Sequence, residues 1–447
     1  MLIIFILVHR ETRFGSAMET VDRLLESLRI SQENGHKEEE EKSCIDLGNI
    51  YLDLKQHERA VEFYEKAFSI CKETGHKDGE RLVCSKIGIV YAALEKHEKS
   101  REYLEKALTI CKESGHEKEE CELHSNLGDV YYALGLHEKS IEHLENALAI
   151  SKKTGSTKLE AKLYKKLGNT HFASSQYEES ISHFQKSLEI RQALKDRGGE
   201  GRLYNLLGYV HCALSQYEKS MEYFEKALVI NEEVEDKRRN GNIHINLGDV
   251  YHALGQYKKS VEYLRKGLQL SKEAQSKQGE GKAYSSLGKV YHVLGEYDKV
   301  IECSTKSLEI SLEVGNRYVE CASLSNMAGV YHARAQYDKC LECNEKALEI
   351  FQSRGDKHGQ GTINTNLGTL YYSLSKYELS VTYYETAIKI SKDIRDRQGE
   401  ALAYLNLGRV QEAVANYPES LKSLQRSLEI SQDIGDQQVE GAAYSSM

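Results

Sequence analysis

Proline and tryptophan are scarce in this sequence of 447 residues, which contains one proline and no tryptophan. Together with a charged fraction of 29%, this composition fits a helical protein with solvated outer faces. The apolar stretch at residues 1–8 is too short to cross a bilayer, which takes ~20 residues, and it lacks the basic start of a signal peptide. No asparagine opens an Asn-x-Ser/Thr sequon. We therefore expect an intracellular, cytoplasmic protein that does not insert into membranes.

Net charge and cysteine usage narrow the class of protein further. The net charge of -9 argues against nonspecific binding of nucleic acid or anionic membrane by the surface as a whole. Several of the ten cysteines lie 40 residues apart, such as Cys44 and Cys84. Equivalent positions of stacked helices are roughly 8 to 10 Å apart, beyond the ~7 Å limit for a disulfide. We expect reduced thiols that pack as small apolar residues.

The dominant feature is a 40-residue period that runs from Cys44 to Met447 without insertion or deletion. Its core is the pattern Leu-Gly-x-x-Tyr, first seen at Leu47, and only Met327-Ala328 breaks its glycine. A unit of this size buries its apolar face only against copies of itself, so the period predicts an elongated stack. The remaining Leu-Gly or Ile-Gly pairs begin at Leu47, Ile87, Leu127, Leu167, Leu207, Leu247, Leu287, Leu367 and Leu407.

Residues 241–280 show the pattern of one unit. Apolar residues from Ile243 to Leu254 recur at helical spacing and end at Gly255, which predicts a first helix, helix A. A similar series from Val261 to Leu270 predicts helix B. Glycine inside helix A costs about 1 kcal/mol relative to alanine, so its recurrence indicates close approach of a neighbouring helix. We expect a large side chain at Gly248 to force the pair apart.

These residues resemble the tetratricopeptide repeat family in the order Leu-Gly-x-x-Tyr, then a small residue, then an aromatic residue or leucine four positions later. Examples of the last two are Ser180 with Phe184 and Ser220 with Phe224. The 40-residue length is similar to the long variant of the LGN/Pins group of polarity scaffolds and of tetratricopeptide repeat protein 28-like proteins. The resemblance implies an all-α fold, an α-solenoid in which paired helices form a right-handed superhelix.

The period divides the chain into four segments. Residues 1–16 form an atypical apolar N-terminus, interpreted as a degraded or truncated first helix, and residues 17–40 form the second helix of a partial repeat with its connector. Val21, Leu24, Leu28 and Ile30 carry this assignment because they match the phase of Val61, Tyr64, Phe68 and Ile70. Residues 41–440 hold ten repeats, and residues 441–447 begin a truncated eleventh.

No catalytic signature is complete, so we expect no enzymatic activity, cofactor or metal. Cys340 and Cys343 form a lone Cys-x-x-Cys without a second half at zinc spacing. His252, His292 and His332 recur at one helix A position, but rings one helix apart are too far from each other to share zinc bonds of about 2 Å. Groove or surface roles are expected for these histidines.

The resemblance implies that helix A lines a concave face that holds an extended peptide or a partner segment. Basic residues concentrate on this face in two successive repeats, which favours an acidic partner, and asparagines there offer donor and acceptor groups to a peptide backbone. The predicted groove residues are Lys162, Lys165, Lys166, Asn169, Arg202, Asn205, Tyr209, Asn242, Asn246, His252, Lys282, Lys289 and His292.

Three other interpretations remain open at this stage. A carboxylate clamp for chaperone C-termini is disfavoured, since Lys165 and Asn169 match its pattern but Leu206, Asn242 and Asn246 do not. RNA binding would need a continuous basic face, which acidic residues interrupt. The array could instead be the sensing or regulatory part of a larger signalling protein or enzyme. The expected partners are proteins and not nucleic acid, with self-association through uncapped ends as a further possibility.

Overall fold

The computed structural model describes residues 2–353 and 355–447, with side chains from residue 18 onward, and every regular element in this part of the chain is an α-helix. The helices are α1 (Leu2–Asn34), α2 (Lys37–Asp53), α3 (His57–Thr74), α4 (Lys77–Ala93), α5 (His97–Ser114), α6 (Glu117–Ala133), α7 (His137–Lys153), α8 (Thr157–Ala173), α9 (Tyr177–Ala193), α10 (Arg197–Ala213), α11 (Tyr217–Glu233), α12 (Lys237–Ala253), α13 (Tyr257–Glu273), α14 (Lys277–Val293), α15 (Tyr297–Val314), α16 (Arg317–Ala333), α17 (Tyr337–Ser353), α18 (Lys357–Ser373), α19 (Tyr377–Asp393), α20 (Arg397–Ala413), α21 (Tyr417–Ile434) and α22 (Gln437–Ser446).

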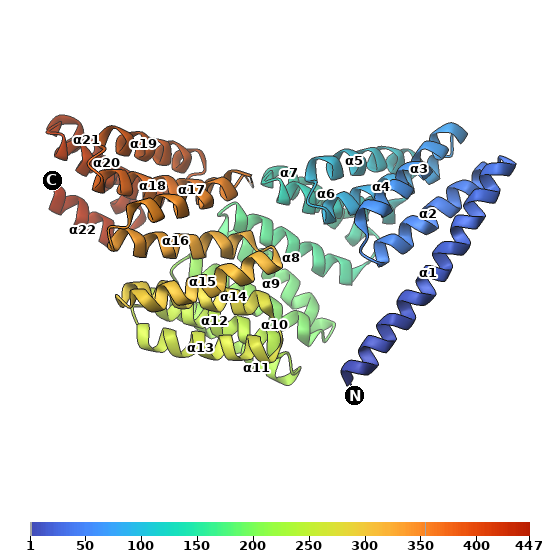
Figure 1. Ribbon diagram of the computed structural model, residues 1–447, viewed down its shortest axis with the longest axis horizontal. Coiled ribbons are helices and arrows are strands. Elements are labelled where there is room, and N and C mark those ends of the chain that lie inside the picture. The colour runs from blue at the N-terminus through green and yellow to red at the C-terminus, as the bar shows by residue number, and fades with distance from the viewer. Residues whose placement is uncertain (1, 354) are drawn as a thin grey trace. The chain divides into compact units, whose positions relative to one another are not determined.

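The helices form consecutive antiparallel pairs, as Figure 1 shows. They divide into two compact units, residues 1–199 and residues 200–447. From α2 onward, each even-numbered helix is a helix A and each odd-numbered helix is the helix B that follows it. Helix A begins four residues earlier than the predicted repeat boundary, at Lys37 and not at residue 41. The predicted all-α solenoid is confirmed, and its helix boundaries repeat with the 40-residue period.

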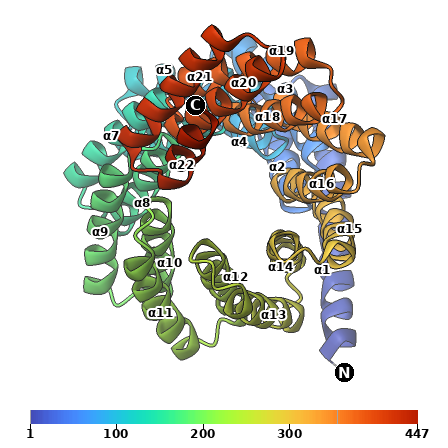
Figure 2. The ribbon, with the colours of Figure 1, turned by 90° about the vertical axis from the view of Figure 1, so that its left-hand side faces the viewer.

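Spacing between helices differs in the two layers of each unit. In the second unit α12 contacts α14, α14 contacts α16, and α18 contacts α20, while in the first α4 contacts α6 and α6 contacts α8. The odd-numbered helices pack mainly against the even-numbered helices next to them in sequence, an order that can be followed in Figure 2. In a curved stack the more closely spaced layer is the concave one. The even helices therefore line the inner side of each unit, as predicted for helix A.

The interior glycines allow the two helices of a pair to touch. A Cβ atom at Gly248 would lie 2.6 Å from Leu264 Cγ and 3.2 Å from the Leu264 backbone nitrogen. The Ser260 hydroxyl donates a hydrogen bond to the Gly248 carbonyl at 2.7 Å, which is possible only at this short separation. The same serine-to-glycine bond joins six further pairs, from Ser100, Ser140, Ser180, Ser220, Ser380 and Ser420. The predicted packing role of the glycines is confirmed.

At the N-terminal end, α1 is one continuous helix across the predicted boundary at residue 16. Val21 and Leu28 are buried in the first core cluster with Cys44 and Leu47, and Leu24 packs against this cluster. Ile30 is 46% exposed, so it does not follow Ile70 into the core. Helix α1 therefore covers the first repeat with Val21, Leu24 and Leu28, three of the four residues predicted to match the repeat. The assignment of residues 1–16 to a degraded helix stays a prediction, because their side chains lie outside the described part.

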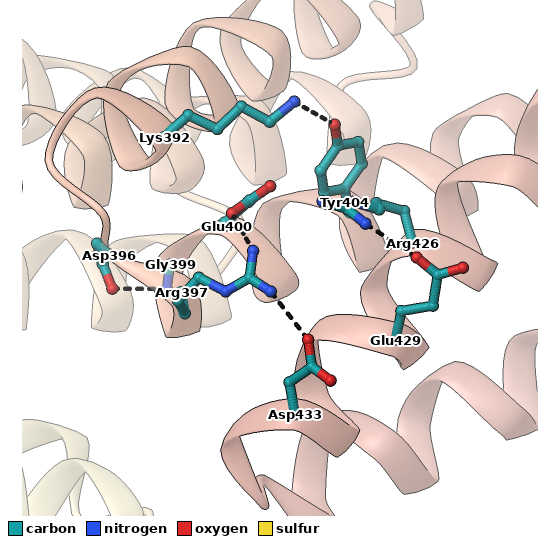
Figure 3. A network of polar contacts seen from close by, with 9 residues as sticks. All are labelled: Lys392, Asp396, Arg397, Gly399, Glu400, Tyr404, Arg426, Glu429 and Asp433. Atoms are coloured by element: carbon teal, nitrogen blue, oxygen red, sulfur yellow. Dashed lines mark hydrogen bonds and ion pairs between the residues drawn. The ribbon is translucent and has the colours of Figure 1, made fainter.

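Polar contacts tie consecutive pairs together on the flank of the stack, as Figure 3 shows for α19 to α21. The Asp396 carboxylate accepts from the backbone N–H of Gly399 at 2.9 Å and caps α20. Arg397 donates to Glu400 at 3.2 Å and to Asp433, one repeat further on, at 3.1 Å. The contact between Arg397 and Asp433 links one repeat to the next.

One such contact predicts a pH dependence of stability. His358 Nδ1 lies 3.2 Å from Asp396 Oδ2. This hydrogen bond raises the pKa of His358 above 6.5 and lowers the pKa of Asp396 below 3.8. Because the histidine pKa is raised on folding, its contribution is complete below pH 6.5 and is lost as the pH rises through the folded-state pKa. His358→Gln should therefore cost a few tenths of a kcal/mol at about pH 5.5 and less at about pH 8, since the side chain is largely exposed.

Thermal unfolding of both proteins at the two pH values measures this difference. Asp396→Asn is the matched background, because asparagine also caps helices but cannot form the ion pair. In that background the pH-dependent part of the His358→Gln effect should disappear. An equal effect of His358→Gln at both pH values would contradict the assignment.

Candidate functional site

The inner face of the first unit is partly neutralised by a contact between repeats. Lys166 on α8 donates to Asp129 at 2.7 Å and to the Ser125 hydroxyl at 2.7 Å, both on α6. Lys162 on the same helix is exposed, and Asn169 is half-buried. The charge of Lys166 is thus balanced inside the protein, and this lysine has a structural role that the predicted basic cluster did not include.

The predicted cluster is also divided between the two units. Lys162, Lys165 and Lys166 belong to the first unit, whereas Arg202 belongs to the second. Each unit therefore has to be considered as a surface of its own, and the richest arrangement of polar side chains lies in the second.

A ladder of side chains connects three successive inner helices of the second unit. Asn246 on α12 donates through Nδ2 to Asn205 Oδ1 on α10 at 2.9 Å. Its Oδ1 accepts from Lys282 Nζ on α14 at 2.6 Å, and the same ammonium group lies 5.3 Å from the centre of the Tyr209 ring. We call these four residues the inner ladder. Asn246 is buried, and both polar atoms of its amide bond to other repeats, so this side chain joins the repeats.

The surface beside the inner ladder is concave and carries exposed tyrosines. Tyr209 is 41% exposed and Tyr318, in the first turn of α16, is 71% exposed. Loss of hydration is the largest cause that raises the pKa of Tyr318, and Tyr209, Asp249 and Asp356 raise this pKa further. The charge of Lys282 lowers it. Exposed tyrosines on the inner face of a repeat protein are typical anchors for a protein partner.

Further along the same face, a hollow of about 410 Å³ lies over α12, α14, α16, α17 and α18. We call it the histidine hollow because the predicted residues His252 and His292 line it together with His332. Lys289, another predicted residue, lies at its wall. The lining residues are His252, Lys289, His292, Val293, Ser325, Asn326, Ala328, Gly329, His332, Ala333, Cys340, Asn344, Asn366 and Thr369.

The structure thus brings some predicted residues together and leaves others apart. Asn205, Tyr209, Asn246 and Lys282 form the inner ladder, and His252, Lys289 and His292 meet at the hollow. Asn242 is half-buried on α12 outside both groups. Sequence reasoning missed Asn344 and Gly329. Asn344 interrupts a column of leucine and aromatic residues that was visible in the aligned repeats, whereas Gly329 stands in a column of varied residues.

The environment of the cysteines does not favour nucleophilic chemistry. All ten are free, and nine are buried. Burial raises the pKa of Cys44, Cys84 and Cys303 to about 11, so these groups stay protonated at neutral pH. A thiol in that state is a poor nucleophile and a poor metal ligand.

One cluster has the composition of a metal site. Ligand atoms of Glu41, Cys71 and His76 lie within 4.8 Å of one another. The carboxylate of Glu41 is 3.0 Å from His76 Nδ1 through each of its oxygens, and this charge lies beside the Cys71 thiol. Burial first, and then Glu41, raise the pKa of Cys71 to about 12. The hydrogen-bonded Glu41–His76 pair accounts for the arrangement without an ion.

The paired helices and their inner layer define an α-solenoid. Comparison with known families makes the class specific: a model described as tetratricopeptide repeat matches residues 41–113, 80–153, 119–193, 199–273, 279–353, 318–393 and 360–433. The chain belongs to the tetratricopeptide repeat family. Members of this family generally mediate protein–protein interactions. A second model, anaphase-promoting complex subunit 5, matches residues 2–47.

Solved structures support the fold at low sequence identity. A Rap protein complexed with competence and sporulation factor is 15% identical, with a TM-score of 0.55 over 82% of this chain and 99% of that one. Aspartyl phosphate phosphatase F from Bacillus subtilis is 17% identical, with a TM-score of 0.54 over 75% and 94%. The apo form of RapI is 18% identical, with a TM-score of 0.51 over 62% and 99%. These identities establish a shared architecture only.

A search of curated proteins gave no match. Among the described residues, the helices lack the combination of length and apolarity that a membrane span requires.

Proposed function

We propose that this chain is a non-catalytic scaffold that binds an extended segment of a partner protein along the inner face of residues 200–447. The observation that carries the proposal is the inner ladder with the exposed Tyr209 and Tyr318 beside it, followed on the same face by the histidine hollow. Anchoring aromatics and a hollow on one concave surface are features of a binding site, whereas packing alone needs neither.

An extended segment suits the spacing of this face. Successive inner helices are roughly 8 to 10 Å apart, and an extended peptide advances about 3.3 Å per residue. Each repeat therefore meets about three residues of the ligand. Many modest contacts over several repeats would then add up to a specific complex.

The charge of the face favours an acidic segment. Arg202, Lys282, Lys289 and Arg409 occupy its inward-facing positions, against Asp249 and Glu412. The chain as a whole has a net charge of -9, so this face differs in sign from the rest. Complementary charge accelerates association and makes it sensitive to salt.

Two finer assignments belong to the same proposal. The 40-residue unit supports placing the array with the long repeats of the LGN/Pins group and tetratricopeptide repeat protein 28-like proteins. Ten free cysteines are consistent with a reducing compartment, and we place the protein in the cytoplasm.

Binding of model peptides to the full chain tests the proposal. The probe is a fluorescein-labelled peptide in which glutamate alternates with serine, and its partner peptide has glutamine in place of glutamate. The acidic peptide should bind more tightly, and added salt should reduce the difference. Lys289→Glu should weaken the acidic peptide roughly tenfold, equivalent to about 1.4 kcal/mol.

Lys266→Glu is the matched control, because Lys266 is an exposed lysine on the outer helix α13. Both variants change the net charge equally, so only the position differs. The proposal fails if the wild-type chain binds the glutamine peptide as tightly as the acidic one, or binds neither. Equal weakening of binding by the two substitutions would show a general effect of charge and would contradict binding at the inner face.

A further inference from the structure

Two successive repeats depart from the packing rule of the others. Sixteen positions after the interior glycine, helix B normally carries a large side chain that covers it, as Tyr64 covers Gly48 and Leu264 covers Gly248. In α15 and α17 these positions hold Ser304 and Asn344. Both side chains are buried, with exposed fractions of 0% and 1%. Two neighbouring layers of the core have therefore lost their largest apolar group.

The same repeats differ at two further positions. Val300 and Cys340 replace the serine that donates to the glycine carbonyl in seven other repeats, and Ala328 replaces the glycine itself. On the inner face, Gly329 stands where other repeats have a side chain, and a Cβ atom there would lie 2.8 Å from His292 Nε2. Of these residues, Ala328, Gly329, Cys340 and Asn344 line the histidine hollow.

The floor of the hollow contains a buried acceptor without a partner. Asn344 Nδ2 donates to the Cys340 carbonyl at 2.9 Å, which identifies the other amide atom as the oxygen. This oxygen, Asn344 Oδ1, is buried and has no hydrogen-bond partner, while Asn344 lines the hollow. Burying such an atom is unfavourable, and leucine, as at position 264, would avoid it. A ligand N–H or O–H group would satisfy this oxygen.

The walls of the hollow offer positive and donor groups. Lys289, His292, His332 and Asn366 surround it, and no carboxylate is among the lining residues. His252 Nε2 is a second buried atom without a partner. Burial and the charge of Lys289 lower the pKa of His252, so this ring is neutral at pH 7. The hollow therefore presents the ammonium group of Lys289 and the imidazole rings of His292 and His332 together with a buried acceptor.

We propose that the histidine hollow is a subsite for an acidic residue of the bound segment, with its carboxylate near Lys289 and His292 and its peptide N–H donating to Asn344 Oδ1. This proposal rests on the proposed function and adds the identity of one ligand residue. The volume of about 410 Å³ lies within the range of small-ligand sites, so one or two residues of an extended segment fit.

A double substitution that rebuilds the usual packing tests the subsite. Leucine at 344 alone would meet the Cβ atom of Ala328, as the 2.6 Å separation at the Gly248–Leu264 pair shows. Ala328→Gly with Asn344→Leu instead recreates the glycine–leucine pair of other repeats. We expect this variant to melt at a higher temperature than the wild-type chain and to bind the alternating glutamate–serine peptide at least tenfold more weakly.

A minimal probe separates the subsite from the groove. N-acetylglutamate amide carries one side-chain carboxylate and peptide N–H groups, and N-acetylglutamine amide lacks only the charge. Titration of the full chain, followed by NMR, should show that the first probe binds the wild-type chain more tightly than the second. The double variant should bind neither.

Each remaining result has a distinct meaning. If the double variant keeps its fold and binds the acidic peptide as the wild-type chain does, the subsite is wrong while the proposed function stands. If no acidic peptide binds but N-acetylglutamate amide binds only the wild-type chain, the extended groove is wrong and the subsite stands. Equal binding of the two amides overturns the carboxylate assignment, and binding of no probe overturns both proposals.

Discussion

Replacing Gly248 with leucine should lower the free energy of unfolding by roughly 3 kcal/mol, the upper end of the usual cost of overpacking a core. The first added carbon alone would lie 2.6 Å from Leu264 Cγ, 2.7 Å from Leu264 Cδ2 and 3.2 Å from the backbone nitrogen of Leu264. Since the backbone of α13 is among these atoms, a rotamer change of Leu264 cannot relieve the contact. The Ser260 bond to the Gly248 carbonyl should be lost as α12 and α13 separate.

Thermal unfolding of the full chain measures this effect, and alanine variants give the matched control. Gly361 is also inside an inner helix, but a Cβ atom there would meet Ile390 Cγ2 at 3.5 Å and Ser391 Oγ at 3.7 Å, which are ordinary contacts. Gly361→Ala should therefore stabilise the helix by up to about 1 kcal/mol, and Gly248→Ala should destabilise the pair. The same sign for the two alanine substitutions would refute the packing role of Gly248.

Most of the fold could be predicted because the same pattern of apolar residues and interior glycine recurs in ten repeats. One glycine in a helix is ambiguous, but a glycine such as Gly248 in phase with an apolar stripe indicates close helix packing. The period gave helix pairs, the inner layer and buried tyrosines such as Tyr51 and Tyr91. It placed helix starts four residues late, because polar residues such as Lys37 begin the helix before the apolar stripe starts.

Contacts between side chains of different repeats could not be predicted in the same way. The position of Lys166 in the repeat places it on the inner face, but its partners Ser125 and Asp129 depend on the rotation of one repeat against the next. Asn246 is an equivalent case, since its amide is used by Asn205 and Lys282. Counting charges by position overestimates the groups available to a ligand, because neighbours in the stack bind each other first.

The histidine hollow shows where irregular positions carry more information than regular ones. The sequence shows His252, His292 and His332 in one column, but a stripe of rings by itself predicts no cavity. The cavity is lined by Asn344, which replaces the leucine or aromatic residue of most other repeats, and by Gly329, where other repeats have a side chain. Sites in a repeat protein are thus better sought where the packing rule is broken than where a surface residue recurs.

Phe224→Ala should lower the free energy of unfolding by roughly 3 to 5 kcal/mol. This substitution removes a buried aromatic ring from the helix B position that covers the interior glycine, the position that Asn344 occupies in α17. The ring is 1% exposed and covers Gly208, where a Cβ atom would lie 2.7 Å from two of its carbons. Ala227, Ile243 and Leu247 belong to the same core cluster. Their side chains cannot close the space, since α11 and α12 are held apart by the repeats on either side.

Asn344→Ala is the matched comparison, since Asn344 is the equivalent residue of α17 and is equally buried. This substitution removes an oxygen without a partner and enlarges a space that is already open, so we expect a change within about 1 kcal/mol. Melting temperatures of the two variants against the wild-type chain test the contrast. A loss at position 344 as large as that at position 224 would mean that Asn344 is a packing residue like the others, and the hollow would then need no ligand to explain it.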